Sequence, residues 1–382
     1  MKSIKTPIAI SGIGCVTCVG SGVQSLWDSA LQGRMGIVEG LGKVNGFEAT
    51  ETSRAVAIAT ESISEALLQA GWSGLEDNDG LIIATTTGQI GSWENELTEF
   101  VRHNLSLTDF DKAWKSQTLG SIVGAISKKL NYSGKTLLLT SACSAATQAI
   151  ALGSLWIEKG YVNRCLVGGV ETLSHLTTEG FRALQLLASN PAAPFDQNRN
   201  GINLGEGAGF LCLEKQPKVT LAYVSGFGLS TDAYHMTAPH PEGRGSLEAM
   251  SSALRTAHLM AKDIGWIHAH GTGSQANDLA EGQAISQLFG TEPPWTTSTK
   301  GVHGHTLGAS GAIESILCVK ALEEQRILKT LGLKTPDPLI QLRHPTSSLK
   351  MNLKHVLKNT LGFGGNNAAL VFSHHSTKYD SV

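Results

Sequence analysis

The chain has 382 residues, enough for two or three ordinary domains or one large α/β unit, and an apolar share typical of a globular protein. A formal net charge of -2 argues against a nucleic-acid-binding surface, and no apolar run is long enough to predict a membrane span. Six widely spread cysteines do not form a disulfide scaffold, and the opening segment resembles a β-strand more than a signal peptide, so a cytoplasmic protein is expected.

Ten short apolar runs are expected to form strands that are buried on both faces of a sheet. The first five begin at Ile8, Leu81, Thr136, Cys165 and Gly209, and the second five begin at Leu221, Trp266, Trp295, Leu357 and Ala368. Helical periodicity lies between the runs, over residues 53–71, 144–160, 276–290 and 308–325. Alternating strands and helices predict an α/β fold in which helices cover the sheets.

The two series of strands suggest two similar halves that meet near residues 215–221. We expect an N-terminal half over residues 1–217, which carries the candidate nucleophile, and a C-terminal half over residues 218–382, which carries the candidate histidines. No low-complexity or Pro/Ser-rich linker separates the halves, and no sequence identity is visible between them. The duplication is therefore predicted from the pattern alone.

Cys143 lies between a predicted strand and a predicted helix. The thiolate is the nucleophilic form of cysteine, and a helix N-terminus stabilises that anion through its free N–H groups and its dipole. Small neighbouring residues leave room for a substrate carbonyl, and the backbone N–H of Cys143 is a candidate arm of an oxyanion hole. By contrast, Cys165, Cys212 and Cys318 lie within apolar runs and are expected to be packing residues.

Cys15 and Cys18 form an isolated C-x-x-C pair, a spacing that occurs in redox sites and in zinc sites. No second C-x-x-C is present to complete a four-cysteine zinc site. We expect both cysteines to be small packing residues at the turn that follows the first strand.

Two histidines, His270 and His305, lie in glycine-rich segments between a predicted strand and a predicted helix. Ligand-binding residues of α/β folds gather at strand ends, and flanking glycines allow a ligand to approach the backbone closely. Each histidine belongs to an H-x-H pair, with His268 and with His303, so a zinc site is a rival interpretation. No carboxylate or cysteine lies at a recognisable ligand spacing, and the glycines favour an organic substrate. Two unrelated core histidines are the third possibility.

Together these motifs resemble the β-ketoacyl-acyl carrier protein synthases of the thiolase superfamily, in the group with a Cys-His-His site. The similar stretches follow the order of the family across almost the whole chain: IAISGIG, TSACSAATQAI, PFDQNRNGINLGEGAG, STDAYHMTAPHPEGRG, HAHGTGSQAND, STKGVHGHTLGASGAIES and LGFGGNNAALVF. The resemblance implies a thiolase-like, five-layered α/β/α/β/α fold built from two similar halves. It implies neither a cofactor nor a metal.

The resemblance also assigns roles to individual residues. Cys143 would be the nucleophile that is acylated, and His270 and His305 would be the paired active-site histidines. Lys300 would shape the charge of the site, with Glu314 as its acidic partner.

Further residues match the family at the edge of the site. Phe363 would be the gating phenylalanine, and its N–H would form the oxyanion hole together with that of the nucleophile. Asp278 matches an acidic residue that supports the site. Asp196 and Arg199 are expected to form a structural salt bridge. Arg182 is a candidate contact for an acidic carrier protein, and a simple helix-surface arginine is the alternative.

The implied activity is that of an acyltransferase, a 3-oxoacyl-acyl carrier protein synthase, which condenses a Cys-bound acyl group with malonyl carrier protein and releases CO₂. Its partners would be an acyl carrier protein with phosphopantetheine-linked acyl and malonyl groups, and a second subunit, either identical or a related ketosynthase-like chain. Fatty acid, polyketide and aryl-polyene biosynthesis are the implied pathways. Ile202 and Asn366, where the family usually has Phe and Thr, leave the chain length of the substrate open.

Two other functions fit part of this pattern. A chain-length-factor-like partner subunit of a heterodimeric ketosynthase would resemble a synthase but lack the cysteine, so Cys143 with both histidines favours an active enzyme. A biosynthetic thiolase would use a second cysteine near the C-terminus, where this chain has GFGG at residues 362–365.

Overall fold

The computed structural model describes residues 6–47, 53–103 and 118–377. Within these residues, one mixed sheet contains all ten strands that the sequence predicts. They are β1 (Ile8–Thr17), β4 (Gly80–Ala84), β5 (Lys135–Leu139), β6 (Arg164–Glu171), β8 (Gly207–Glu214), β9 (Ala222–Thr231), β10 (Trp266–His268), β11 (Trp295–Thr297), β14 (His355–Gly362) and β15 (Asn366–His374). An eleventh strand, β2 (Gly20–Ser21), pairs with β1.

Each half of this sheet repeats the same strand order. The N-terminal strands lie in the order β5-β4-β6-β8-β1, and the C-terminal strands lie in the order β11-β10-β14-β15-β9. In both sets the third strand along the chain is at the outer edge and the first is at the centre. The sets join where residues 8–10 of β1 pair with residues 222–224 of β9. This repetition supports two similar halves, and the boundary after residue 217 stays a prediction.

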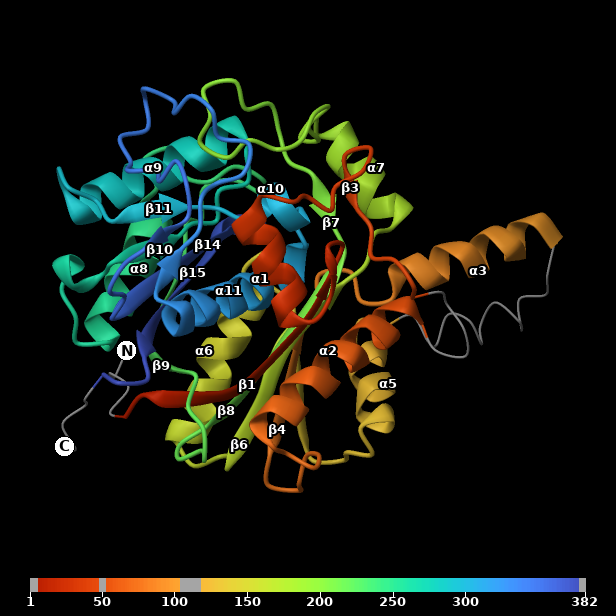
Figure 1. The fold of residues 1–382 in the computed structure, drawn as a ribbon. Helices are drawn as coiled ribbons and strands as arrows, with labels where there is room; N and C mark the ends of the chain where they lie inside the picture. Colours follow the sequence, from red (N-terminus) through yellow and green to blue (C-terminus); the bar gives the residue numbers. More distant parts are fainter. Residues whose placement is uncertain (1–5, 48–52, 104–117, 378–382) are drawn as a thin grey trace.

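The long helices form three layers, one between the two sets of strands and one on each outer face (Figure 1). The central layer holds α6 (Ala145–Glu158) and α11 (Ser310–Glu324). One outer layer holds α2 (Arg54–Ala70) and α5 (Ser121–Lys129), and the other holds α8 (Arg244–Thr256) and α9 (Gln275–Phe289). Layers of helix, sheet, helix, sheet and helix therefore follow one another, as the resemblance implied.

The remaining elements are short or peripheral. The helices are α1 (Val23–Gln32), α3 (Ile90–His103), α7 (His175–Ala183) and α10 (Lys300–His303), and the 3₁₀ turns are η1 (Ala261–Asp263), η2 (Leu307–Ala309) and η3 (Phe363–Gly365). The short strands are β3 (Leu41–Gly42), β7 (Leu204–Gly205), β12 (Arg326–Ile327) and β13 (Leu349–Lys350). None of the described helices is long and apolar enough to cross a membrane.

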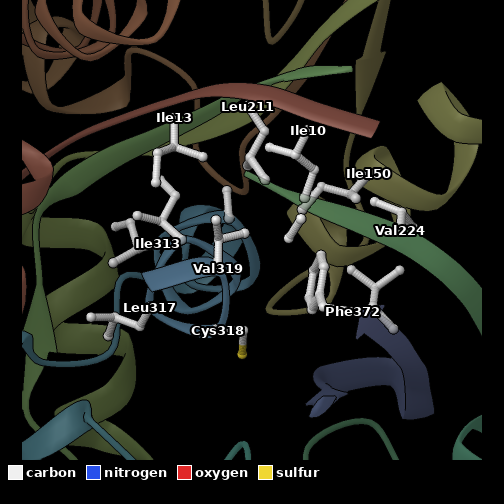
Figure 2. Close-up of a cluster of buried hydrophobic side chains, with 14 of the residues drawn as sticks. Ile10, Ile13, Ile150, Leu211, Val224, Ile313, Leu317, Cys318, Val319 and Phe372 are labelled. Carbon is white, nitrogen blue, oxygen red and sulfur yellow. The ribbon is translucent and has the colours of Figure 1, made fainter. Parts of the chain in front are cut away.

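The central helices pack in the largest hydrophobic core of the molecule. Figure 2 shows side chains of α11 against those of β1, β8 and α6, and those of β9 and β15 beside them. Every residue of α11 from Ser310 to Val319 is buried, which explains why this helix has no polar face. Glu314 is the charged residue in that buried stretch, so it must find charged or hydrogen-bonding partners inside the protein.

All six cysteines are unpaired, as the sequence predicts for a chain without a disulfide scaffold. Cys165, Cys212 and Cys318 are fully buried in β6, β8 and α11. Cys15 is buried within β1, and Cys18 directly follows this strand, so both pack at the predicted strand and turn.

Candidate active site

The candidate catalytic residues converge from both halves of the sheet, beyond the carboxyl ends of parallel strands. Cys143 follows β5, His270 follows β10, Lys300 follows β11 and Phe363 follows β14. This edge of a sheet is where α/β folds bind ligands. His305 differs from the expectation, because it follows the one-turn helix α10 and not a strand.

A tight turn presents Cys143 at the start of α6. Ala142 has a φ of 46°, in the left-handed region that non-glycine residues rarely adopt, and Ser144 is the N-cap of the helix. The hydroxyl of Ser144 donates to the carbonyl of Ser141 over 2.9 Å, and Gln148 Nε2 donates to Ser141 Oγ over 2.7 Å. These bonds hold the turn that places the thiol at the helix N-terminus.

Cys143, His270 and His305 lie together, as the sequence predicts. His305 Nε2 is 3.0 Å from Cys143 Sγ. The rings of His270 and His305 meet edge to face, with centroids 5.1 Å apart and planes at 81°. All three side chains are buried, so the sulfur and both imidazoles share one environment of low polarity.

The ligand atoms of these three residues lie within 4.8 Å of one another, a spacing that a metal ion could bridge. The ammonium of Lys300 lies 3.2 Å from His270 Nδ1, and its positive charge disfavours a cation there. The zinc interpretation also needs both histidines of an H-x-H pair on one ion. His268 and His303 instead contact the hydroxyl of Thr299. In each pair, therefore, one histidine lies near Cys143 and the other lies against Thr299.

A buried charge cluster lies behind the histidines. Lys300 Nζ is 2.5 Å from Glu314 Oε1, and Lys358 Nζ is 2.8 Å from Glu314 Oε2. Burial alone would raise the pKa of Glu314, but the two ammonium groups hold it well below its usual range. The expected pair of Lys300 and Glu314 is therefore present, within a cluster that has one more cation than the sequence indicated.

Lys300 determines the tautomer of His270. An ammonium group has only donors, so His270 Nδ1 accepts a hydrogen bond from Lys300 and the ring proton must sit on Nε2. Lys300 also donates to the carbonyl of His270 over 2.6 Å. Burial, and next the charge of Lys300, lowers the pKa of His270 well below its ordinary value. His270 is thus a neutral imidazole whose Nε2–H is available as a donor.

The partners of His305 permit either tautomer. His305 Nδ1 is 2.9 Å from the hydroxyl of Ser310, which can donate or accept. Nε2 can therefore accept the thiol proton of Cys143 or carry a proton of its own. Burial, followed by Lys300, lowers the pKa of His305 well below its ordinary value, so this ring is also neutral.

Burial of Cys143 opposes the thiolate that the helix N-terminus was expected to stabilise. Burial raises the pKa of Cys143 to about 11, although Lys300 and the backbone N–H groups of Phe363 and Cys143 act in the opposite direction. Desolvation outweighs the helix N-terminus because the sulfur is enclosed by protein. Attack by the sulfur therefore requires a base for its proton, and His305 Nε2 lies in contact.

Two acids support the segment around His270, and the nearer one is not the one that the sequence indicated. Asp278 accepts hydrogen bonds from the N–H groups of Gly273 and Phe195, over 3.2 and 2.8 Å. Glu281, one turn further along α9, accepts from the N–H of His270 itself over 2.7 Å. A second acid at helical spacing on a buried helix was the available signal for Glu281.

Other supporting residues were also missed in the sequence. Glu171, at the end of β6, is buried and accepts from the N–H groups of Thr86 and Gly308 over 2.8 and 3.1 Å. It thereby ties the end of β4 to the segment that follows His305. Lys358 had a visible signal, because it is the lone lysine in the strand β14, which is buried over residues 355–361.

The expected salt bridge between Asp196 and Arg199 is wrong, because the guanidinium of Arg199 pairs with two other carboxylates. Arg199 Nη1 is 2.5 Å from Asp337 and its Nε is 3.7 Å from Asp278, whereas it reaches Asp196 only at the backbone carbonyl. The carboxylate of Asp196 accepts from backbone N–H groups, among them that of Lys334 over 2.7 Å. Both residues hold loops together, and neither lines the cavity described next.

A cavity of about 360 Å³ opens above Cys143. It is lined by Cys143, His270 and His305, by apolar residues that include Ile202 and Leu361, and by polar residues that include Thr272, Asn277 and Gln275. Phe363 lines the cavity and stacks on Phe181 of α7, with ring centroids 5.5 Å apart and planes at 14°. Arg182, which follows Phe181 in the chain, has a side chain that is 62% exposed and forms an ion pair with Glu179.

Comparisons with known proteins agree with this geometry. Residues 39–218 match the family described as beta-ketoacyl synthase, N-terminal domain, and residues 221–334 match its C-terminal domain. The chain is 31% identical to the 3-oxoacyl-[acyl-carrier-protein] synthase 2 of Synechocystis sp., over 96% of this chain and 98% of that protein. It is 28% identical to the enzyme of the same name from Staphylococcus aureus, over 96% and 97% of the two chains.

Two solved structures are similar throughout their length. The ishigamide ketosynthase/chain length factor superposes with a TM-score of 0.90 at 27% identity, over 97% of this chain and all of that one. A ketosynthase in complex with its chain length factor, from Xenorhabdus doucetiae, superposes with a TM-score of 0.85 at 31% identity, over 97% and 98% of the two chains.

Proposed function

This chain belongs to the beta-ketoacyl synthase family, and on that premise we propose that it is a 3-oxoacyl-acyl carrier protein synthase, an acyltransferase that extends an acyl chain by decarboxylative condensation with malonyl carrier protein. The observation that carries this proposal is the buried contact of 3.0 Å between Cys143 Sγ and His305 Nε2, in a cavity that His270 also lines. A chain-length-factor-like partner subunit has no need of this constellation.

In the first half-reaction, the sulfur of Cys143 attacks the carbonyl carbon of an acyl thioester on the phosphopantetheine arm of the carrier. The thiol proton passes to His305 Nε2 as the new carbon–sulfur bond forms. The carrier thiolate then leaves and takes that proton, so the acyl group has moved to Cys143. The backbone N–H groups of Cys143 and Phe363 both lower the pKa of this thiol. We propose that the same two groups donate hydrogen bonds to the carbonyl oxygen and stabilise the negative charge that develops on it.

In the second half-reaction, a malonyl thioester enters the cavity after the first carrier arm has left. Its bond to the carboxylate breaks, CO₂ leaves, and the electron pair forms an enolate whose negative oxygen faces the histidines. His270 Nε2–H donates to that oxygen, and His305 donates as well once its proton is on Nε2, a tautomer that Ser310 permits. The enolate carbon attacks the acyl-Cys143 carbonyl and forms the new carbon–carbon bond. Cys143 leaves as a thiolate and takes a proton from solvent, because the overall reaction consumes one proton.

The reaction uses no cofactor beyond the phosphopantetheine arm that the carrier brings. We place it in the cytoplasm, a compartment that keeps thiols reduced, because all six cysteines are unpaired. Fatty acid, polyketide and aryl-polyene pathways all supply such substrates, and the acyl group found on the enzyme would distinguish them.

The proposal is tested by mixing the purified protein with acyl and malonyl carrier proteins. We expect intact-protein mass spectrometry to show one acyl group on the chain, and peptide mass spectrometry after digestion to locate it on the peptide that contains Cys143. A 3-oxoacyl product on the carrier should follow. A protein that never becomes acylated, but raises the output of a second synthase that copurifies with it, would instead support the partner-subunit function.

We also propose that the protein works as a dimer, with a second copy or with a related ketosynthase-like chain. Strand β5, which leads to Cys143, lies at the outer edge of the sheet and is partly exposed. Unpaired strand edges invite pairing with another chain, and two-fold dimers are the commonest oligomers. Light scattering should give about twice the chain mass of 40.3 kDa. An active monomer at micromolar concentration would contradict this.

Arg182 is proposed to contact the acidic carrier protein, because it is exposed beside Phe181 at the cavity. Arg182→Glu should raise the apparent KM for the carrier several-fold at low salt, and the difference should shrink as salt screens the charges. Arg255→Glu is the matched control, since Arg255 is also an exposed helical arginine paired with a glutamate, on α8. Equal carrier KM values for both variants would remove Arg182 from the interface.

A further inference from the structure

The outer histidines of the two H-x-H pairs form a hydrogen-bonded bridge that the proposed reaction does not use directly. His268 Nε2 is 3.0 Å from Thr299 Oγ1, and the same oxygen is 3.0 Å from His303 Nε2. All three side chains are fully buried. Neither Nδ1 atom has a hydrogen-bond partner among the described residues, so the hydroxyl is the polar contact of both rings. We name these three residues the histidine bridge.

Each member of the histidine bridge adjoins one catalytic group along the chain. His268 lies two residues before the first catalytic histidine, His303 lies two residues before the second, and Thr299 immediately precedes Lys300. The three catalytic groups come from the end of β10, the start of α10 and the loop after α10. One hydroxyl therefore connects the three segments that carry them.

The protonation of the histidine bridge suits a hydroxyl at its centre. Burial lowers the pKa of His268 to about 3 and that of His303 to about 4, with Glu314 opposing the shift and Lys300 and Lys358 adding to it. Both rings are therefore neutral. A neutral imidazole offers a donor or an acceptor at Nε2, and the Thr299 hydroxyl can accept from one ring while it donates to the other. A side chain without a hydroxyl could satisfy neither ring.

Both ends of the histidine bridge are held by the surrounding fold. The ring of Trp266 packs edge-on against His268, with centroids 5.5 Å apart, and its Nε1 donates to Thr297 Oγ1 over 2.9 Å. At the other end, Cys18 Sγ donates to the carbonyl of His303 over 3.6 Å. The histidine bridge thus connects the end of strand β10 to helix α10 and the loop that follows it.

We propose that the histidine bridge sets the separation of the two catalytic imidazoles, and that Thr299 is a positioning residue for the second half-reaction. This inference rests on the proposed function. A single enolate oxygen must receive hydrogen bonds from both His270 and His305, so a small change in their spacing lengthens at least one bond. The contact between Cys143 and His305 needs only one imidazole. Loss of the bridge should therefore slow decarboxylation more than acylation.

The test is Thr299→Val, which keeps the shape of the side chain and removes the hydroxyl. We expect kcat for CO₂ release from malonyl carrier to fall about tenfold, with KM within about twofold and the acylation rate of Cys143 within about threefold of wild type. Thr299→Ser restores the hydroxyl and should restore the ratio of decarboxylation to acylation. A purely structural role for Thr299 would change the melting temperature but not this ratio.

Thr256→Val is the matched control. Thr256 is a buried threonine of α8 whose hydroxyl accepts from Phe227 N over 2.9 Å and donates to Phe227 O over 2.7 Å. Its loss should cost comparable stability and leave the ratio unchanged. If Thr299→Val does not fold, Thr299→Cys, with a weaker donor of similar size, gives the same test at smaller amplitude.

The outcomes separate this inference from the proposed function. A wild-type enzyme that condenses, with variants at Thr299 that keep the wild-type ratio of decarboxylation to acylation, overturns the role of the histidine bridge alone. A wild-type protein that is neither acylated nor releases CO₂ overturns the proposed function itself.

Discussion

Cys143→Ala is expected to take up no acyl group and to form no 3-oxoacyl product, with a loss of at least about 10⁴-fold in condensation. The reason is that the sulfur is the atom that carries the acyl chain between the half-reactions, and alanine fits the same turn before α6 without replacing it. His270 and His305 remain in place, so the variant should still release CO₂ from malonyl carrier. Removal of the thiol also frees His305 Nε2 from its contact with Sγ.

Two measurements on this variant check the assignment: the intact mass after incubation with acyl carrier, and CO₂ release from labelled malonyl carrier. Cys165→Ala is the control, because Cys165 is a buried thiol of β6 that does not line the cavity. That control should still bind one acyl group. Condensed product from Cys143→Ala would show that another residue is the nucleophile.

His270→Ala should have the opposite profile, with CO₂ release reduced about 10²–10³-fold and acylation of Cys143 largely retained. Removal of one donor to a developing oxyanion costs about 3–4 kcal/mol, which corresponds to that range. His270 is the histidine whose tautomer Lys300 fixes as an Nε2–H donor, so this loss falls on the enolate. The thiol of Cys143 contacts His305, which the variant keeps.

His305→Ala provides the contrast, since it removes both a donor to the enolate and the base in contact with the thiol. We expect it to slow acylation as well as CO₂ release. His258→Ala, at an exposed position outside the cavity, controls for the loss of an imidazole. If His270→Ala blocked acylation and kept CO₂ release, the two histidines would have to exchange their roles.

The strands were the most predictable part of the fold, because strands buried on both faces of a sheet are near-continuous apolar runs. Helix α8 was not predicted, although its large apolar residues Leu247, Met250 and Leu254 recur at helical spacing. It packs on β9 through small residues, and a Cβ at Gly226 or Gly228 would collide with the backbone of Ala253 or Ala249. The close approach of this helix to the sheet could not be predicted, because only the fold brings these glycines and alanines together.

The residues of the candidate site could be predicted from local motifs, but several of their partners depend on the tertiary fold. Motifs located Cys143, the two catalytic histidines and Lys300, because these residue types stand out within glycine-rich frames. The partner of Arg199 was not predictable, since Asp337 lies 138 positions away and only the fold brings it near. The protonation state of Cys143 was also out of reach, because it depends on how completely the folded chain excludes water from the sulfur.

The central position of β1 has a consequence for how the chain matures during synthesis. This strand ends at Thr17 and is synthesised well before its long partners β8 and β9, which end at Glu214 and Thr231. At 5–20 residues per second, roughly 10–40 s pass before β8 is complete. Throughout that interval an apolar strand of ten residues has no partner to pair with, apart from the two-residue β2. Nascent chains of this protein should therefore depend on chaperones that shield exposed strands until both halves can close around β1.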